Sequence, residues 1–235
     1  MDSIREVRHK SAVDIVTDVD VQSEKEVCAT LLSAFPTHSI LGEEGGARVG
    51  SDPRYRWIVD PIDGTTNYAH GFPFFCVSIG FEVQGKLTLG VAYAPSLDEL
   101  FVAEAGRGAT VNGRPIQVSA TSELTQALLA TGFPYDRGEF ARALKSFELV
   151  SMHSQAVRRA GSAVLDLCYV ACGRLDGYWE HQVKPWDMAA GALVVLEAGG
   201  TVTATDGSAF SVEGGQVLAT NGLLHPTLTA TLAGI

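Results

Sequence analysis

The chain has 235 residues and a formal net charge of −10, with 46% hydrophobic and 19% charged residues, a composition typical of globular proteins and not of disordered ones. The negative charge disfavours nucleic acids and anionic lipids as partners, and no apolar run reaches the roughly 18 residues that span a bilayer. Because the N-terminal stretch MDSIREVRHK lacks a signal-peptide core and the four cysteines lack metal-binding spacing, we expect a cytoplasmic protein with reduced cysteines.

The first half of the sequence predicts one helix followed by a run of strands. Apolar residues recur at helical spacing over 23–35, and Pro36 ends the pattern. Strands are expected around residue 40 and over 56–60, 75–84, 86–94 and 99–104. Gln84-Gly85 and Asn112-Gly113 are typical of hairpin turns.

The second half alternates between strands and helices. Strands are expected over 128–131, 176–180, 200–204 and 216–220, and helices over 139–150, 161–172, 186–198 and at the C-terminus. This order predicts helices packed on a second sheet. We place a boundary near residue 120, which divides one compact catalytic unit into an N-terminal α+β half (1–120) and a C-terminal α/β half (121–235).

Acidic residues recur where predicted elements begin or end. Asp60 and Asp63 follow an apolar strand, and Glu43 follows the strand around residue 40. Asp14, Asp18 and Asp20 precede the first helix, and Asp187 begins a later helix. Each acid has a simpler interpretation, because turns, polar loops and helix caps all favour such residues.

A shared location for these acids would have a chemical consequence. Two like charges 4 Å apart repel by about 4 kcal/mol at an effective dielectric constant near 20, so converging carboxylates bind cations or protons. Ligand sets of oxygen alone favour Mg²⁺. The following Gly64-Thr65-Thr66 would let a phosphate approach backbone amides at the start of a helix. Metal-binding acids beside phosphate-binding amides predict a phosphatase.

Several segments together resemble the inositol monophosphatase family of Mg²⁺-dependent, lithium-sensitive phosphatases. They are KSAVDIVTDVD, LGEE, WIVDPIDGTTNYAHGFPFFCVSIG, RRAGSAVLDL, YWEHQVKPWDMAAG and LEAGG, from about Lys10 to the C-terminus. The resemblance implies the layered αβαβα sandwich shared by inositol monophosphatase and fructose-1,6-bisphosphatase, a homodimer, and no covalent phosphoenzyme.

The resemblance also implies roles for individual residues. Two to three Mg²⁺ ions are expected, the first held by Glu43, Asp60 and the Ile62 carbonyl, the second by Asp60, Asp63 and Asp187, and a weaker third touched by Glu43. Asp20 and Thr65, with Glu43, would orient and deprotonate the attacking water. Gly64 and Thr65 would receive the phosphate, Glu180 the substrate hydroxyls, and Ala160 and Ser162 would line the sugar side.

Within the family, inositol 1-phosphate is the first expected substrate, hydrolysed to inositol and phosphate, because polyol recognition needs an acceptor such as Glu180. Three alternatives remain. Relatives with the same metal core act on fructose 1,6-bisphosphate, histidinol phosphate or nucleotide 3′-phosphates. Haloacid-dehalogenase phosphatases carry D-x-D-G-T with an aspartyl nucleophile, but here Ile62 occupies the position of their second acid. Some bacterial members of the family act as non-catalytic partners of the transcription machinery.

Overall fold

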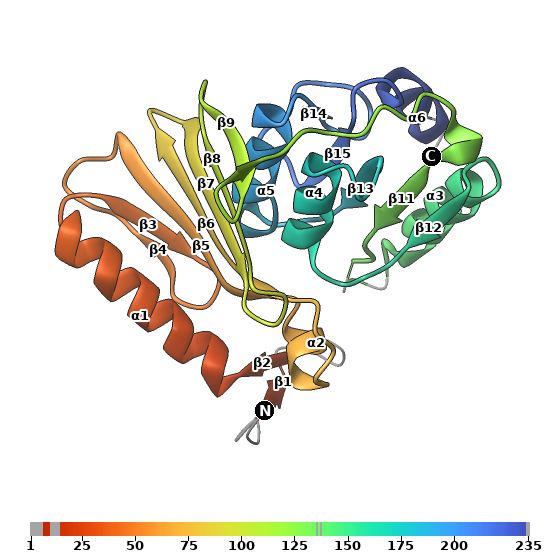
Figure 1. Ribbon diagram of the computed structural model, residues 1–235. Coiled ribbons are helices and arrows are strands. Elements are labelled where there is room, and N and C mark those ends of the chain that lie inside the picture. The colour runs from red at the N-terminus through yellow and green to blue at the C-terminus, as the bar shows by residue number, and fades with distance from the viewer. Residues whose placement is uncertain (1–6, 10–14, 135, 137, 234–235) are drawn as a thin grey trace.

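The described part of the chain forms layers of helices and sheets. The computed structural model describes residues 7–9, 15–134, 136 and 138–233. In Figure 1 the layers follow one another as α1 (Asp18–Ala34), a larger sheet, the pair α4 (Ala163–Ala171) and α5 (Pro185–Glu197), a smaller sheet, and the pair α3 (Phe140–Ser151) and α6 (His225–Leu232). This order confirms the predicted αβαβα sandwich.

The larger sheet is built from the first half of the chain. Its order over the described residues is β10 (Arg114–Pro115), β9 (Gly108–Val111), β8 (Glu99–Glu104), β7 (Lys86–Ala94), β6 (Cys76–Val83), β5 (Tyr55–Asp63), β3 (Ser39–Gly42) and β4 (Gly46–Arg48). β3 and β5 run parallel, and the other neighbours are antiparallel. Both predicted hairpin turns are present, with positive φ at both central residues. Short β4, β9 and β10 were not predicted, because two to four residues carry little periodicity.

The smaller sheet is built from the second half. Its described strands lie in the order β12 (Ala156–Arg158), β11 (Leu128–Thr131), β13 (Gly177–His181), β15 (Gln216–Thr220) and β14 (Thr201–Thr203). β11 is parallel to both of its neighbours, and β15 is antiparallel to both of its own. The remaining elements are β1 (Val7–His9), β2 (Ile15–Thr17), α2 (Thr65–Ala69) and a 3₁₀ turn (Leu124–Gln126). The division into functional halves near residue 120 stays a prediction.

Two facing glycines let α5 lie directly on the larger sheet. Gly80 on β6 pairs with Gly90 on β7. A Cβ atom at Gly80 would lie 2.7 Å from the Ala189 Cβ, and one at Gly90 would lie 2.7 Å from the Ala190 carbonyl oxygen. This close contact fixes the first turn of α5, which carries Asp187, beside the end of β5.

The first helix begins earlier than its apolar spacing predicts. Thr17 caps α1, and its hydroxyl and the Asp20 carboxylate form a capping box. Asp18 and Asp20 therefore lie in the first turn of the helix and not before it, whereas Asp14 lies outside the described residues. The predicted start at residue 23 was wrong because the polar first turn has no apolar periodicity.

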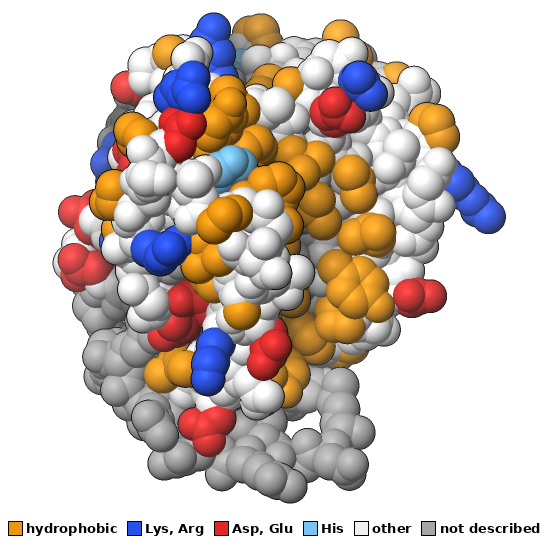
Figure 2. Space-filling view, turned by 90° about the vertical axis from the view of Figure 1, so that its left-hand side faces the viewer, with side chains coloured by type: hydrophobic (Ala, Val, Ile, Leu, Met, Phe, Trp, Pro, Cys, Tyr) orange, Lys and Arg blue, Asp and Glu red, His pale blue; other side chains and the backbone are white. Residues whose placement is uncertain are grey.

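The outer side of the larger sheet, where α1 packs, also carries apolar side chains that α1 does not cover. Tyr93 and Leu100 pair across β7 and β8 and are exposed. Figure 2, which views the molecule from the side of α1, shows apolar side chains gathered on this surface. Tyr93 and Leu100 alternate along their strands with Ala92 and Phe101, which are buried in the main core, so this surface lies across the sheet from α5.

Among the described helices, none is both long and apolar enough to cross a membrane.

Candidate metal centre

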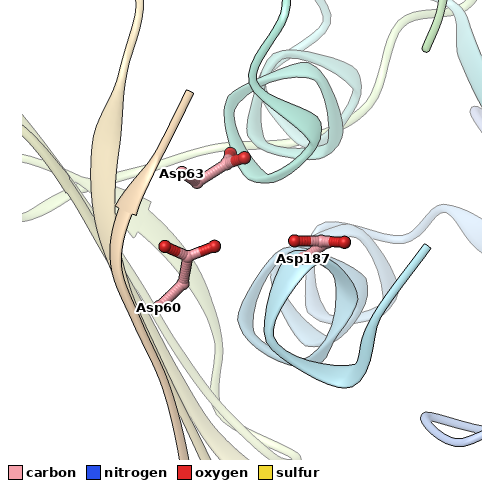
Figure 3. Close-up of side chains that lie close together, drawn as sticks. All are labelled: Asp60, Asp63 and Asp187. Atoms are coloured by element: carbon pink, nitrogen blue, oxygen red, sulfur yellow. The ribbon is translucent and has the colours of Figure 1, made fainter. Parts of the chain in front are cut away.

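Three aspartates from distant parts of the chain meet at one end of the larger sheet. Asp60 and Asp63 lie at the end of β5, and Asp187 lies in the first turn of α5. One carboxylate oxygen from each lies within 4.8 Å of those from the other two. Figure 3 shows Asp60 and Asp187 facing each other, with Asp63 directed toward α4. The sequence prediction that these acids converge is therefore confirmed.

Two of the carboxylates use one oxygen to stabilise the local backbone. Asp60 Oδ1 accepts a hydrogen bond of 2.9 Å from the Ile62 N–H. Asp187 Oδ2 accepts a hydrogen bond of 2.7 Å from the Lys184 N–H and so caps the backbone at the start of α5. The cap interpretation of Asp187 is therefore correct, and it leaves the second oxygen available to a cation.

Asp63 is held by the start of α4. Its Oδ2 accepts hydrogen bonds from the Ser162 hydroxyl at 2.5 Å and the Val164 N–H at 2.8 Å, and its Oδ1 accepts a longer one of 3.3 Å from Ala163. Ser162 is itself the N-cap of α4. The helix was expected to begin at Gly161, but Gly161 has a φ of +92° and precedes the cap. Asp63 thus ties the end of β5 to α4.

The electrostatics of the cluster favour a cation. Burial raises the pKa of Asp60 well above its usual range, and the negative charges of Glu43, Asp63 and Asp187 raise it further. Burial also raises the pKa of Asp187 well above its usual range and that of Asp63 to about 6. These carboxylates bind protons more tightly than free carboxylates do, unless a bound cation takes the place of the protons.

The donor set suits a hard divalent ion. The carboxylates supply only oxygen atoms, which Mg²⁺ prefers over the nitrogen and sulfur ligands of zinc sites. Glu43 and Ile62 line the same cavity as the three aspartates. The Glu43 N–H bonds the Val59 carbonyl at 3.2 Å, one residue before Asp60. The residues expected to bind metal therefore share one cavity.

Thr65 and Asp20 form a hydrogen-bonded pair beside the cluster. Thr65 Oγ1 lies 3.0 Å from Asp20 Oδ1 and 3.0 Å from the Ile62 carbonyl oxygen. Asp20 is fully buried, and its other oxygen accepts hydrogen bonds from the N–H and hydroxyl of Thr17. The Thr65 side chain is thus oriented from both sides. Gly64, with a φ of +93°, precedes it at the edge of the cavity.

The cavity extends from the aspartates toward the smaller sheet, with a volume of about 320 Å³. Glu180 lines its far side and accepts a hydrogen bond from the Tyr178 hydroxyl. A Cβ atom at Gly132 would lie 2.0 Å from the Glu180 carboxylate, so glycine there provides its space. Burial and, to a lesser extent, the negative charge of Asp63 raise the pKa of Glu180 to about 7, against the opposing effects of Tyr178 and Arg159.

Two residues expected on the sugar side serve the scaffold. Ser162 lines the cavity, but its hydroxyl is used by Asp63. Ala160 is absent from the described cavity lining, and its carbonyl accepts a hydrogen bond of 2.8 Å from the Asn67 side chain. Their contact with substrate stays a prediction.

The sequence prediction missed three charged residues of the cavity, Asp166, Arg159 and Lys184. Asp166 is only 2% exposed, and burial raises its pKa well above the usual range. An acid inside the otherwise apolar helix GSAVLDL was a signal that could have found it. Arg159 adjoins a second arginine and carried no such signal.

Known proteins are similar to this chain over nearly its whole length. A model described as the inositol monophosphatase family matches residues 2–235. A protein of Synechocystis sp. named inositol-1-monophosphatase is 47% identical, with 98% of this chain and 81% of the relative covered. A protein of Pseudomonas aeruginosa named Nus factor SuhB is 45% identical, with 96% of this chain and 85% of the relative covered.

Solved structures are also similar to this chain over nearly its whole length. The structure of inositol monophosphatase from Anabaena (Nostoc) sp. superposes with a TM-score of 0.89 at 50% identity, covering 92% of this chain and 86% of that one. The crystal structure of extragenic suppressor protein suhB from Bartonella henselae gives a TM-score of 0.93 at 43% identity, covering 97% and 88%.

Proposed function

Because this chain belongs to the inositol monophosphatase family, we propose that it hydrolyses phosphate monoesters with the help of divalent metal ions. The observation that carries the proposal is the cluster of Asp60, Asp63 and Asp187, whose oxygens lie within 4.8 Å of one another. Burial of such a cluster is costly without a cation, and phosphate is the substrate group that Mg²⁺ commonly bridges.

We expect the residues around the cluster to bind two to three Mg²⁺ ions. Glu43, Asp60 and the Ile62 carbonyl would hold one ion, Asp60 with Asp63 and Asp187 a second, and Glu43 would touch a third. When bound, the ions supply Lewis-acid chemistry, which polarises the phosphate and favours deprotonation of water near neutral pH. The anchored oxygens of Asp60 and Asp187 support these roles, because their side chains are already oriented.

The pair Thr65 and Asp20 would handle the proton of the attacking water. Thr65 Oγ1 can accept a hydrogen bond from water while it donates to Asp20 Oδ1, 3.0 Å away. Asp20 keeps its orientation because Thr17 occupies its other oxygen. Glu43 would complete the set, and the phosphate would lie against Gly64 and Thr65 at the cavity edge. This arrangement fits attack by water in line, without a phosphorylated side chain.

The proposed substrate is a phosphorylated polyol, with inositol 1-phosphate first. Support comes from Glu180, whose carboxylate lies in the same cavity as the aspartates and suits the hydroxyl groups of a polyol as an acceptor. Fructose 1,6-bisphosphate, histidinol phosphate and nucleotide 3′-phosphates are the alternatives. As in the family at large, we also propose inhibition by lithium, a homodimer and a cytoplasmic location.

A phosphate-release assay over these four substrates tests the proposal, with Mg²⁺, with Mg²⁺ plus lithium, and with chelator. We expect Mg²⁺-dependent release that is fastest with inositol 1-phosphate. Asp60→Asn should lower kcat at least about 100-fold, since a group that stabilises charge at the reacting centre is lost, with the circular dichroism spectrum unchanged.

The matched control is Asp98→Asn, which removes the same charge from an exposed turn and should keep full activity. Near wild-type turnover in Asp60→Asn would overturn the assignment. An adduct with beryllofluoride would also overturn it, because only an aspartyl nucleophile forms one.

A second candidate function rests on the 45% identical relative named Nus factor SuhB. This chain would then also bind the transcription machinery, apart from catalysis. Capture of RNA polymerase by the purified protein, compared between wild type and Asp60→Asn, tests this candidate. Equal capture by both would separate it from hydrolysis, and no capture by either would exclude it.

A further inference from the structure

One face of α1 is polar and is directed at the end of β5 and the turn after β3, which carry candidate metal ligands. Asp20, Ser23 and Glu24 share this face, since residues three and four apart are neighbours on a helix. Asp20 bonds Thr65, and the Ser23 hydroxyl donates to the Pro61 carbonyl at 3.2 Å. Asp20 and Glu24 are the buried residues of this described helix. Buried carboxylates need hydrogen-bond donors as partners. The donors for Glu24 lie in the turn after β3.

Glu24 holds that turn through both carboxylate oxygens. Its Oε2 accepts a hydrogen bond of 2.8 Å from the Glu44 N–H, and its Oε1 accepts one of 2.6 Å from the Gly45 N–H. The preceding N–H, of Glu43, bonds the Val59 carbonyl. Three consecutive amides therefore have acceptors, and the backbone that carries Glu43 is fixed from two sides. Glu24 is only 6% exposed, so water does not compete strongly for these bonds.

Two glycines provide the space for this carboxylate. A Cβ atom at Gly42 would lie 2.6 Å from Glu24 Cδ, and one at Gly45 would lie 2.6 Å from Glu24 Oε1. Any other residue at these positions would displace the carboxylate from the turn. The motif Gly-Glu-Glu-Gly thus places two charged side chains between two positions that must stay small.

Glu24 lies outside the cavity of the metal centre. The described lining of that cavity includes Glu43 and Asp60 but not Glu24. Glu24 lines a separate cavity of about 370 Å³, together with residues of α1, β3 and β4. Any effect of Glu24 on the metal centre would therefore act through the turn and the position of the Glu43 side chain.

We propose that Glu24 is a positioning residue that sets the affinity of the chain for its divalent ion. It holds the turn that carries Glu43, whose negative charge raises the pKa of Asp60. The inference rests on the proposed function, in which Glu43 is a metal ligand. Partners that orient metal ligands typically contribute roughly 10–100-fold in metal affinity.

Glu24→Gln tests this role, because the amide keeps the shape but replaces one acceptor oxygen with a donor. We expect the Kd for Mn²⁺, used as the probe in calorimetry, to rise roughly tenfold or more. The Mg²⁺ concentration for half-maximal phosphate release should rise in parallel, while kcat at saturating Mg²⁺ stays near that of the wild type. Glu26→Gln is the matched control, since it removes the same charge from an exposed position of the same helix.

Gly45→Ala provides an independent variant that leaves the Glu24 side chain chemically intact. Its Cβ would displace the carboxylate, so we expect the same loss of metal affinity. This variant decides the question if Glu24→Gln fails to fold. An unchanged Kd for Mn²⁺ in the folded variants would overturn the inference, as would a loss of kcat that saturating Mg²⁺ does not restore. A wild-type protein without Mg²⁺-dependent hydrolysis would instead overturn the proposed function, and calorimetry would still test Glu24.

Discussion

At the scale of single residues, a variant of Glu180 can separate the proposed substrate recognition from hydrolysis. Its carboxylate lies on the far side of the cavity from β5, and hydrogen bonds to charged groups contribute about 1.5–3 kcal/mol. We therefore expect Glu180→Gln to raise KM for inositol 1-phosphate roughly 10- to 100-fold. Hydrolysis of p-nitrophenyl phosphate, which has no hydroxyl groups for Glu180, should change little. Equal effects on both esters would contradict a role in polyol binding.

The same residue predicts a pH dependence of substrate binding. Burial raises the pKa of Glu180 to about 7, so the ionised carboxylate, the stronger acceptor, is lost as the pH falls below that value. KM for inositol 1-phosphate should rise as the pH is lowered through about 7 in the wild type. The profile of Glu180→Gln should be flatter over this range, because an amide does not titrate there.

At the scale of elements, the contact of α5 with β6 and β7 positions Asp187. Gly90→Ala would place a Cβ atom 2.7 Å from the Ala190 carbonyl oxygen. Because a backbone atom cannot move aside as a side-chain tip can, α5 must shift away from the sheet. We expect a loss of about 1–3 kcal/mol in the free energy of unfolding, as is typical of overpacking, and weaker Mg²⁺ binding.

Denaturant unfolding and calorimetry measure these two effects of Gly90→Ala. Gly80→Ala, which meets the Ala189 Cβ atom at 2.7 Å, should act in the same direction. Thr88→Ala is the control on β7, because the Thr88 hydroxyl bonds only the nearby Lys86 carbonyl in the described structure. Unchanged metal binding in both glycine variants would show that Asp187 is positioned by other contacts.

Elements with strong periodicity or clear turn signals were predictable, and elements defined by tertiary contacts were not. The alternation in β6 and the Asn112-Gly113 turn follow from local sequence. The early start of α1 depends on a capping box, and three-residue β12 exists through its pairing with β11. Short strands such as this one are specified by neighbours far away in the sequence.

The residues of the candidate site also divide into those that could be predicted from the sequence and those that could not. Asp60, Asp63 and Asp187 were predictable because each follows or begins a recognisable element and the motif is specific. Glu24 and Gly132 were not, because their roles depend on partners at least 18 residues away in the chain. A sequence identifies the residues that carry unusual chemistry more readily than those that orient them.

At the scale of the whole molecule, we expect the buried acids of the cavity to make stability depend on pH and on metal. Burial raises the pKa of Asp63 from 3.8 to about 6 and that of Glu180 from 4.5 to about 7. Between the unfolded and folded pKa values the folded state binds more protons, so the free energy of unfolding falls as the pH rises through this window. The metal-free protein should therefore melt several degrees higher at pH 5 than at pH 8, since 1 kcal/mol shifts Tm by about 2–4 °C at this size.

Mg²⁺ at pH 8 should restore the melting temperature, because an ion bound only by the folded state stabilises it. Asp60→Asn should raise the melting temperature of the metal-free protein at pH 8 while reducing the response to Mg²⁺. Thermal scans with and without chelator measure both effects. A metal-free melting temperature that rises from pH 5 to pH 8 would contradict this account.

The anchored oxygens of Asp60 and Asp187 have a consequence for the entropy of ion binding. A free carboxylate loses rotamer freedom when it captures an ion, whereas these two lose it when the chain folds. Binding of the proposed ion would then carry little ordering cost, because these side chains are already oriented in the folded chain. For the proposed metal site, we expect such preset carboxylates to favour the short bonds of Mg²⁺ over the longer bonds of Ca²⁺.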